Sequence, residues 1–404
     1  MLKKQKERVK KRIVATMRIA VAVLIVLGVI YMAVDHQCRE QSREKYEPVA
    51  RYYLERLEEE KSWIAGQQHE MGPIYLYDLG ADDEGTIVPY FSCKAAMGLL
   101  AGEVTDEHLK RVELYLNWHA EEIVKNNGIV SDYRVVNGVL EPKGEYDSVD
   151  AYLALYLSLL ATYAECGGAL ERIAYAEESV KICADVLDNL TVNGLTKVSE
   201  ETEVCYLMDN LEVLEAYEKI YRLLTSDNSA VATWESGEYL TDFFGQSKDA
   251  CRQAILLYLW NESEKRFEVG VNKRFECLEF QGMEEFYPYA VCQIHPVACD
   301  VSIVDVRLMQ NLYEQINANY TWVELESGTS FERPVLAYTA VQLGDLERAE
   351  KYMENYHVKY AEIREYPFHT SNAGLAAQTY GKLYEYYNDK ANQNLWDILF
   401  GQFL

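Results

Sequence analysis

The chain has 404 residues, of which 49% are hydrophobic and 26% are charged, with 8 Pro and 22 Gly. This composition excludes a disordered chain, a collagen-like chain and a small disulfide-held protein, because a chain of this kind can bury a sizeable core. Residues 1–12 carry a charge of +6, so the other 392 residues carry −32. No basic cluster follows Arg12, and the acidic body repels phosphates, which excludes a nucleic-acid-binding function.

An apolar stretch of 22 residues runs from Ile13 to Val34 with Arg18 as its single charge. As a helix rising about 1.5 Å per residue, it is long enough to cross a hydrocarbon layer of about 30 Å. The basic residues before it predict a cytoplasmic N-terminus and an extracellular body in the cell membrane. A cleaved secretory signal is the alternative interpretation, although its apolar core usually has about 7 to 15 residues.

This pattern predicts four parts along the chain. They are a basic cytoplasmic tail over residues 1–12, a single-pass transmembrane anchor over 13–34, a stalk over 35–43 and one domain over 44–404. No linker rich in Pro, Gly or Ser divides the body. The nine cysteines and seven histidines show no C-x-x-C or H-x-x-x-H spacing, so we expect no metal site. Several cysteines lie inside apolar helical patterns, where buried free thiols are expected.

The body shows a helical period of 3.6 residues in about twelve segments and almost no strand pattern. Six segments are poor in charge, as enclosed helices are: residues 90–101, 149–163, 206–224, 287–299, 334–344 and 371–387. Six are amphipathic, as surface helices are: residues 45–64, 106–125, 170–190, 238–260, 301–317 and 345–360. The two kinds alternate along the chain.

The connections between these segments also have a regular pattern. A step from an enclosed helix to the next amphipathic helix is short, whereas the loop in the other direction is long. Long loops in a compact domain usually carry function, and in an up-and-down array they all emerge at one end. The alternation therefore predicts an all-α (α/α)6 toroid of six helical hairpins with one working face. An open stack of helix pairs is the alternative.

Carboxylates occur where the second and third enclosed helices begin. Asp147 and Asp150 open the second helix, and Asp209 opens the third. Glycoside cleavage needs one protonated carboxyl and one ionised carboxylate. We expect Asp209, with either Asp147 or Asp150, to be the catalytic pair. Helix capping is the alternative role for Asp147, because a short carboxylate accepts hydrogen bonds from the first helical turn.

Aromatic residues are expected at the same end of the array. Rings with a polar tip suit the faces of sugars, although Tyr is also an ordinary packing residue. The expected substrate-binding residues are Tyr146, Tyr206, Tyr287, Trp322, Tyr366 and His369.

Three segments carry a resemblance to a known superfamily: Tyr146 to Leu155, Tyr206 to Val213 and Phe286 to Pro296. With the helical alternation, they resemble the six-hairpin glycosidase superfamily. The start of the second enclosed helix is similar to the Asp-x-Asp motif of family 8 glycoside hydrolases, with its aspartates three positions apart rather than two. Relatives often carry Asp after Tyr-Pro, where this chain has Tyr289. The resemblance implies cleavage of a polysaccharide or oligosaccharide by an acid and a base carboxylate, without a cofactor.

Other functions of the same toroid remain open at this point. One is a catalytically inactive glycan-binding or scaffolding module of an envelope polysaccharide assembly at the membrane. Another is a sugar epimerase or lyase that uses His369 or Tyr366 as its base. The charge of the body favours a neutral or amino-sugar glycan over a polyuronate.

Overall fold

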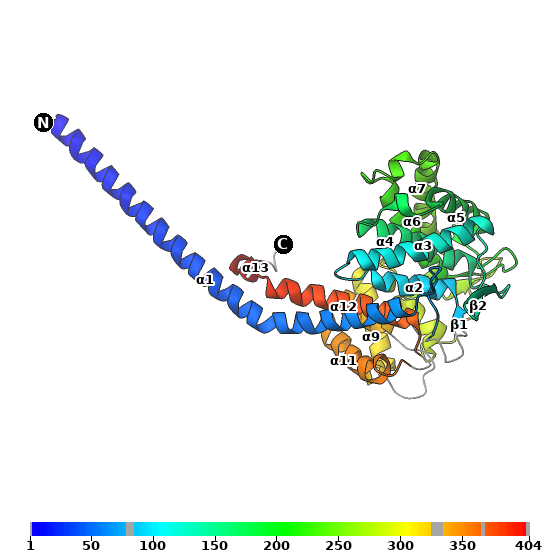
Figure 1. Ribbon diagram of the computed structural model, residues 1–404. Helices are drawn as coiled ribbons and strands as arrows, with labels where there is room; N and C mark the ends of the chain where they lie inside the picture. The colour runs from blue at the N-terminus through cyan, green and yellow to red at the C-terminus, as the bar shows by residue number, and fades with distance from the viewer. Residues whose placement is uncertain (1, 78–84, 325–333, 365–367, 401–404) are drawn as a thin grey trace. The chain divides into compact units, whose positions relative to one another are not determined.

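The computed structural model describes residues 2–77, 85–324, 334–364 and 368–400, which divide into two compact units (Figure 1). The first unit comprises residues 1–54 and 383–404, and the second comprises residues 55–382. Two helices, α1 (Leu2–Gly66) and α12 (Thr370–Ala391), contribute residues to both units. The predicted stalk over residues 35–43 lies within α1 and is helical throughout.

The first unit consists of the N-terminal part of α1, the last turns of α12 and the short helix α13 (Leu395–Phe400). The apolar stretch 13–34 is helical, and its side chains are exposed, as Leu24 is at 67%. Among the described residues, α1 is the one helix long and apolar enough to cross a membrane. Tyr53 stacks on Tyr387 with 5.7 Å between ring centroids, which packs α1 against α12.

The second unit alternates two kinds of helix, as the sequence predicts. The charge-poor helices are α2 (Pro89–Leu99), α4 (Val149–Glu165), α6 (Leu207–Leu224), α8 (Val291–Ala298), α10 (Pro334–Gln342) and the start of α12. The amphipathic helices are the end of α1, α3 (Asp106–Lys125), α5 (Ala176–Leu190), α7 (Gly237–Ala254), α9 (Val306–Asn319) and α11 (Leu346–Tyr356). Single helical turns are η1 (Leu170–Arg172), η2 (Val231–Thr233), η3 (Ile255–Leu259), η4 (Phe286–Ala290), η5 (Trp322–Glu324) and η6 (His357–Ala361).

Burial follows this alternation. Every residue of α4 from Val149 to Ala161 is buried, as its apolar sequence requires. In α5, by contrast, one stripe that includes Val180, Ala184 and Leu187 is buried, while the acidic residues face solvent. The enclosed helices pack on one another in chain order, with α4 against both α2 and α6, and α8 against α6 and α10.

The ring closes where the first and last enclosed helices meet. A Cβ atom on Gly374 of α12 would lie 2.2 Å from the backbone oxygen of Lys94 in α2, so the two backbones touch. The hydroxyl of Thr370 donates a hydrogen bond to the carbonyl of Tyr75 at 2.7 Å, and its amide donates to the carbonyl of Leu76 at 2.9 Å. The second unit is therefore a closed (α/α)6 toroid, and the prediction of this fold is confirmed.

Short strands in the long loops gather these loops at one end of the toroid. Strands β1 (Gly85–Ile87), β2 (Tyr133–Val136) and β3 (Val139–Pro142) form an antiparallel sheet that joins the loops before α2 and α4. Strands β6 (Cys205–Tyr206) and β9 (Gly270–Val271) join the loops before α6 and α8. Two further hairpins pair β4 (Thr191–Val192) with β5 (Leu195–Thr196) and β7 (Trp260–Asn261) with β8 (Arg266–Phe267).

The structure differs from the sequence-based expectation at the ends of two helices. The helix predicted over residues 238–260 ends at Ala254, and the turn η3 and strand β7 follow it. Helix α4 begins at Val149, with Ser148 rather than Asp147 as its N-cap, and the cap makes no side-chain hydrogen bond. The interpretation of Asp147 as the N-cap is therefore wrong, because the first helical residue comes one position later than that role requires.

Candidate active site

The predicted carboxylates come together at the starts of α4 and α6. Asp150 lies in the first turn of α4 and Asp209 in the first turn of α6, and these two helices pack against each other. The charge of Asp150 raises the pKa of Asp209, and so does the charge of Asp147 in the loop before α4. The toroid thus places side chains from distant parts of the sequence in one electrostatic environment.

Asp150 is fully enclosed, with 0% of its surface exposed. One carboxylate oxygen, Oδ2, accepts a hydrogen bond from the Thr196 hydroxyl of β5 at 2.7 Å, and Oδ1 accepts from the Ala151 amide at 3.0 Å. Burial raises the pKa of Asp150 to about 7, although both hydrogen bonds lower it. Asp150 is therefore held by its neighbours on both oxygens and has no open path to solvent.

Asp209 is partly exposed, but its Oδ2 atom is shielded from solvent and has no hydrogen-bond partner among the described residues. Burial raises the pKa of this carboxyl well above its usual range, and the charges of Asp150 and Glu212 raise it further. A hydrogen bond from the side chain of Ser148 offsets part of this effect. Asp209 therefore combines a raised pKa with one oxygen atom that makes no hydrogen bond to the described residues.

Asp147 differs from the other two aspartates because its side chain is exposed. Its Oδ1 atom accepts a hydrogen bond from the Ser148 amide at 2.8 Å. Its charge contributes to the raised pKa values of Asp209 and of Tyr287. Asp147 is thus the most exposed of the three carboxylates.

Glu212 was not among the predicted site residues, but it is the fourth acid of this cluster. It is 2% exposed, and its Oε1 atom accepts hydrogen bonds from Lys94 and from the Tyr90 hydroxyl, both at 2.9 Å. The Nε2 atom of His295 on α8 lies 3.7 Å from the same oxygen. Burial opposes the charge, but Lys94 and His295 outweigh it and lower the pKa of Glu212 to about 2. Glu212 is therefore ionised, and its Oε2 atom has no hydrogen-bond partner among the described residues.

Two signals in the sequence point to this ion pair. Glu212 follows Asp209 by three positions on α6, so both side chains lie on one face of that helix. Lys94 is the single charged residue of the otherwise apolar helix α2. A charge in an enclosed helix needs a partner of opposite sign, and Glu212 is that partner.

Three of the predicted sugar-binding residues, Tyr146, Tyr206 and Tyr287, belong to the segments that lead into α4, α6 and α8. Tyr206 is 37% exposed and Tyr287 is 53% exposed. Burial raises the pKa of Tyr287, and so do the charges of Asp209 and Asp147. Tyr146 is 39% exposed and lies in the same loop as Asp147.

The other three predicted contacts have different surroundings. Burial and the charge of Lys94 lower the pKa of His369 to about 4, so this imidazole is neutral. Its ring lies 5.3 Å from that of Phe91 in α2. Trp322 is 3% exposed; its Nε1 atom donates to Asn317 at 2.9 Å, and its ring packs 5.4 Å from that of Tyr352. It therefore offers no open ring face. Tyr366 lies outside the described residues.

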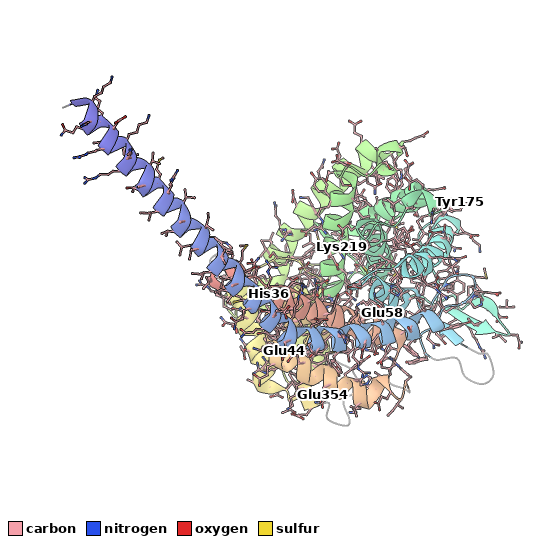
Figure 2. The ribbon with its side chains drawn as sticks, turned by 60° about the vertical axis from the view of Figure 1, so that its left-hand side comes forward. His36, Glu44, Glu58, Tyr175, Lys219 and Glu354 are labelled. Atoms are coloured by element: carbon pink, nitrogen blue, oxygen red, sulfur yellow. The ribbon has the colours of Figure 1, made fainter. Side chains whose placement is uncertain are left out.

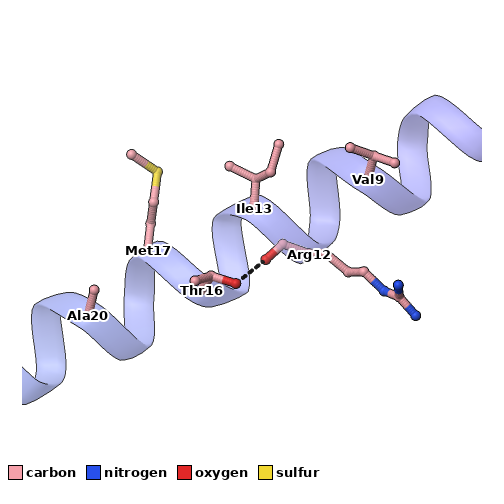
Figure 3. A pocket seen from close by; sticks show the side chains of 6 residues that line it. All are labelled: Val9, Arg12, Ile13, Thr16, Met17 and Ala20. Carbon is pink, nitrogen blue, oxygen red and sulfur yellow. Dashed lines mark hydrogen bonds between the residues drawn. The ribbon is translucent and has the colours of Figure 1, made fainter.

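A separate hollow lies on α1 and is lined by Val9, Ile13, Met17 and their neighbours (Figure 3). All of its lining residues belong to this helix, and the Thr16 hydroxyl donates to the Arg12 carbonyl at 3.0 Å. Residues four positions apart lie on one face of a helix, so the hollow is the space between their side chains. Among the described residues, no group of three His, Cys, Asp or Glu side chains is placed to hold a metal ion.

No protein-family model matches the chain, and no curated protein matches it. Solved structures do. A glycosidase aligns with a TM-score of 0.55 and 9% sequence identity, over 84% of this chain and 98% of its own length. A glycosidase variant aligns with a TM-score of 0.56 and 10% identity, and the alignment covers the same fractions of the two chains. A family 76 glycoside hydrolase from a bovine Bacteroides thetaiotaomicron strain aligns with a TM-score of 0.50 and 10% sequence identity, over 83% of this chain and 78% of its own length. The second unit therefore has the fold of the six-hairpin glycosidases.

Proposed function

We propose that the protein is a membrane-anchored, extracytoplasmic glycoside hydrolase that acts on a neutral or amino-sugar polysaccharide or oligosaccharide. The observation that carries this proposal is the contrast between two acids on one face of α6. Asp209 has a raised pKa, and its Oδ2 atom has no hydrogen-bond partner among the described residues. Glu212, by contrast, has a lowered pKa and is paired with Lys94. Acid and base roles in glycosidases are set by environments that push carboxyl pKa values apart. The shared glycosidase fold supports the same reaction class.

Each carboxylate has a distinct role in the proposed reaction. Asp209 donates its proton to the leaving glycosidic oxygen, because its raised pKa favours the protonated form and its Oδ2 atom makes no hydrogen bond to the described residues. Asp147 is open to solvent and acts as the carboxylate that activates the attacking water. Asp150, held on both oxygens, is a positioning residue that acts on Asp209 through its charge. We propose inversion as the outcome, because the resemblance to family 8 implies it.

The substrate class follows from the charges at the site. Lys94 is paired with Glu212, Asp147 is an exposed acid near the site, and the whole chain carries −26. Such a field attracts a glycan that bears protonated amines and repels a polyuronate. A partly deacetylated amino-sugar polymer is therefore the substrate to test first, with a neutral glucan or mannan for comparison.

The experiment measures reducing ends released by the purified full chain from these polymers. We expect Asp209→Asn to lower kcat by about 10²-fold or more, because the amide cannot donate the proton. Asp227→Asn changes an exposed aspartate outside the group and should leave kcat unchanged. Unchanged turnover by the Asp209→Asn variant would refute the assignment of the acid.

A second candidate is an inactive glycan-binding module, and the enclosure of Asp150 favours it. Of the expected carboxylate pairs, the one formed by Asp150 and Asp209 contains a member with no open path to substrate. The same polymers distinguish the two candidates. Binding of a polymer without release of reducing ends, unchanged in the Asp209→Asn variant, would support the binding module.

The anchor is part of the proposal. The apolar stretch 13–34 spans the membrane once, and the basic residues 1–12 hold the N-terminus in the cytoplasm. The toroid then lies outside the cell, where envelope polysaccharides are found. Retention of the chain in the membrane fraction after an alkaline carbonate wash tests the span.

A further inference from the structure

We propose that helix α13 is a membrane-contact element that inserts Trp396 and Leu399 into the lipid interface beside the outer end of the span. The proposal rests on the proposed anchor and adds a second, separate contact with the same membrane. It is carried by the position of α13 on α1 and by the exposed apolar side chains of α13. Both helical segments belong to the first compact unit.

The position of α13 relative to the span is fixed by a hydrogen bond. The amide of Leu395, the first residue of α13, donates to Oδ1 of Asp35 at 2.8 Å. Asp35 follows directly after the apolar stretch 13–34, which as a helix is about 33 Å long and so matches the hydrocarbon layer. Arg39 pairs with the other carboxylate oxygen of Asp35 at 2.8 Å, as suits a residue in the headgroup region. Helix α13 therefore begins at the level where α1 leaves the hydrocarbon, next to His36 (Figure 2).

The side chains of α13 suit that level. Trp396 and Leu399 lie three positions apart on one face of α13, and each is 55% exposed. Trp is enriched where a membrane meets water, because its ring is apolar and its N–H group is polar. Short amphipathic helices with Trp and Leu on one side lie in this interface with their apolar side chains toward the acyl chains. Tyr31, 47% exposed near the end of the span, is a second aromatic residue at the same depth.

The start of α13 is held in shape by its own polar residues. The amide of Asn394 donates to Oδ2 of Asp397 at 3.0 Å, and the amide of Asp397 donates to Oδ1 of Asn394 at 2.9 Å. This reciprocal cap satisfies two amides that the first turn would leave unpaired. A helix of six residues is marginal in water, so a cap alone does not account for its formation. Contact with lipid supplies the missing stabilisation by covering the apolar side chains.

Lipid is the occupant that the surroundings favour over a second copy of the chain. The surface of α1 adjacent to Asp35 is itself exposed and apolar, with Ile30 53% and Val34 40% exposed. If residues 13–34 span the membrane, these side chains face acyl chains. The apolar side of α13 then continues a surface that lipid already covers, and no additional partner is needed.

The test measures Trp fluorescence of the full chain in liposomes with and without brominated acyl chains, which quench indoles at short range. We expect brominated lipid to remove part of the wild-type emission and to remove markedly less from Trp396→Phe. Trp260→Phe is the matched control, because Trp260 packs 4.8 Å from Phe267 inside the second unit. The Trp260→Phe variant should lose as much emission to brominated lipid as the wild type does. Equal quenching of the wild type and the Trp396→Phe variant would overturn the proposal.

Two further measurements separate the remaining outcomes. If quenching at Trp396 disappears when each lipid disc holds a single chain, the contact is with a second copy and the lipid assignment is wrong. If the alkaline carbonate wash releases the chain, the anchor fails and this inference fails with it. A chain that stays in the membrane but lacks Trp396-dependent quenching refutes α13 alone and leaves the proposed anchor and hydrolase intact.

Discussion

At the scale of single residues, the main feature is that two acids on one helix have pKa values shifted in opposite directions. Glu212 is stabilised as an anion by Lys94 and His295, and Asp209 is surrounded by other carboxylates. The sequence alone predicted Asp209 as a site residue, because it is a charge at the start of an apolar helix. It could not reveal which acid has the raised pKa, since that depends on the burial of each acid and on the charges around it.

The pH dependence of activity tests this arrangement through Glu212→Gln. An acid that must be protonated loses activity as pH rises through its pKa, so the raised pKa of Asp209 sets the basic limb of the profile. The variant removes a negative charge that raises this pKa and leaves Lys94 without its partner, and both changes favour ionised Asp209. We expect the basic limb of kcat against pH to move to lower pH.

Glu215→Gln is the matched control, because Glu215 lies on the same helix but pairs with Lys219 at 2.7 Å. Lys219 is labelled on α6 in Figure 2. The control should keep the wild-type basic limb. A Glu212→Gln profile that coincides with the wild-type profile would show that the charge of Glu212 does not act on the proton donor.

At the scale of helices and strands, the type of each helix was predictable and its contacts were not. The absence of charge from α4 and the apolar stripe of α5 are properties of the local sequence, so enclosed and surface helices could be told apart. The hairpin turns were missed, although Asn137-Gly138 and Asn193-Gly194 both carry the Asn-Gly signal, with φ values of 51° and 75°, and of 51° and 88°. The close approach of α2 and α12 has no such local signal.

The contact between α2 and α12 can be tested with Gly374→Ala. Its Cβ would lie 2.2 Å from the Lys94 carbonyl oxygen and 2.9 Å from the Ala95 Cα atom, both in the backbone. The helices must separate to accept it, and overpacking of this kind typically costs about 1–3 kcal/mol. We expect the free energy of unfolding in urea to fall by that amount.

Gly237→Ala provides the comparison, because a Cβ atom there meets nothing closer than 3.9 Å. This helical position should keep or slightly gain stability, since Ala favours helix. Equal stability of the Gly374→Ala variant and the wild type would mean that α2 and α12 are not in backbone contact.

At the scale of the whole second unit, the property that matters is closure of the ring. Thr370, at the start of the last enclosed helix, bonds to the carbonyls of Tyr75 and Leu76, nearly 300 positions earlier in the chain. Closure brings α2, α4, α6 and α8 around one centre, which is why Lys94, Asp150, Glu212 and His295 interact.

Thr370→Val tests how much the hydrogen bond from Thr370 to the Tyr75 carbonyl contributes to the free energy of unfolding. It keeps the shape of the side chain and removes the hydroxyl that donates to the Tyr75 carbonyl. Loss of a buried hydrogen bond costs about 1–3 kcal/mol when a group is left unsatisfied, so we expect the urea midpoint to fall accordingly. Thr370→Ser retains the donor and should lose much less stability. Identical midpoints for the Val and Ser variants would mean that the hydrogen bond adds little to the closed ring.

The sequence by itself determined the class of the fold, the alternation of enclosed and surface helices, the long-loop end and the apolar stretch 13–34. These follow from local composition and period, because a helix must match its buried faces to its surroundings. The tertiary structure decided that the ring closes and that Glu212 belongs to the site and is ionised. It also decided that Asp150 and Trp322 are buried, whereas Asp147 is exposed to solvent. These depend on distances between residues far apart in the chain, where the energy of a charge or a hydrogen bond is set by neighbours that the local sequence does not specify.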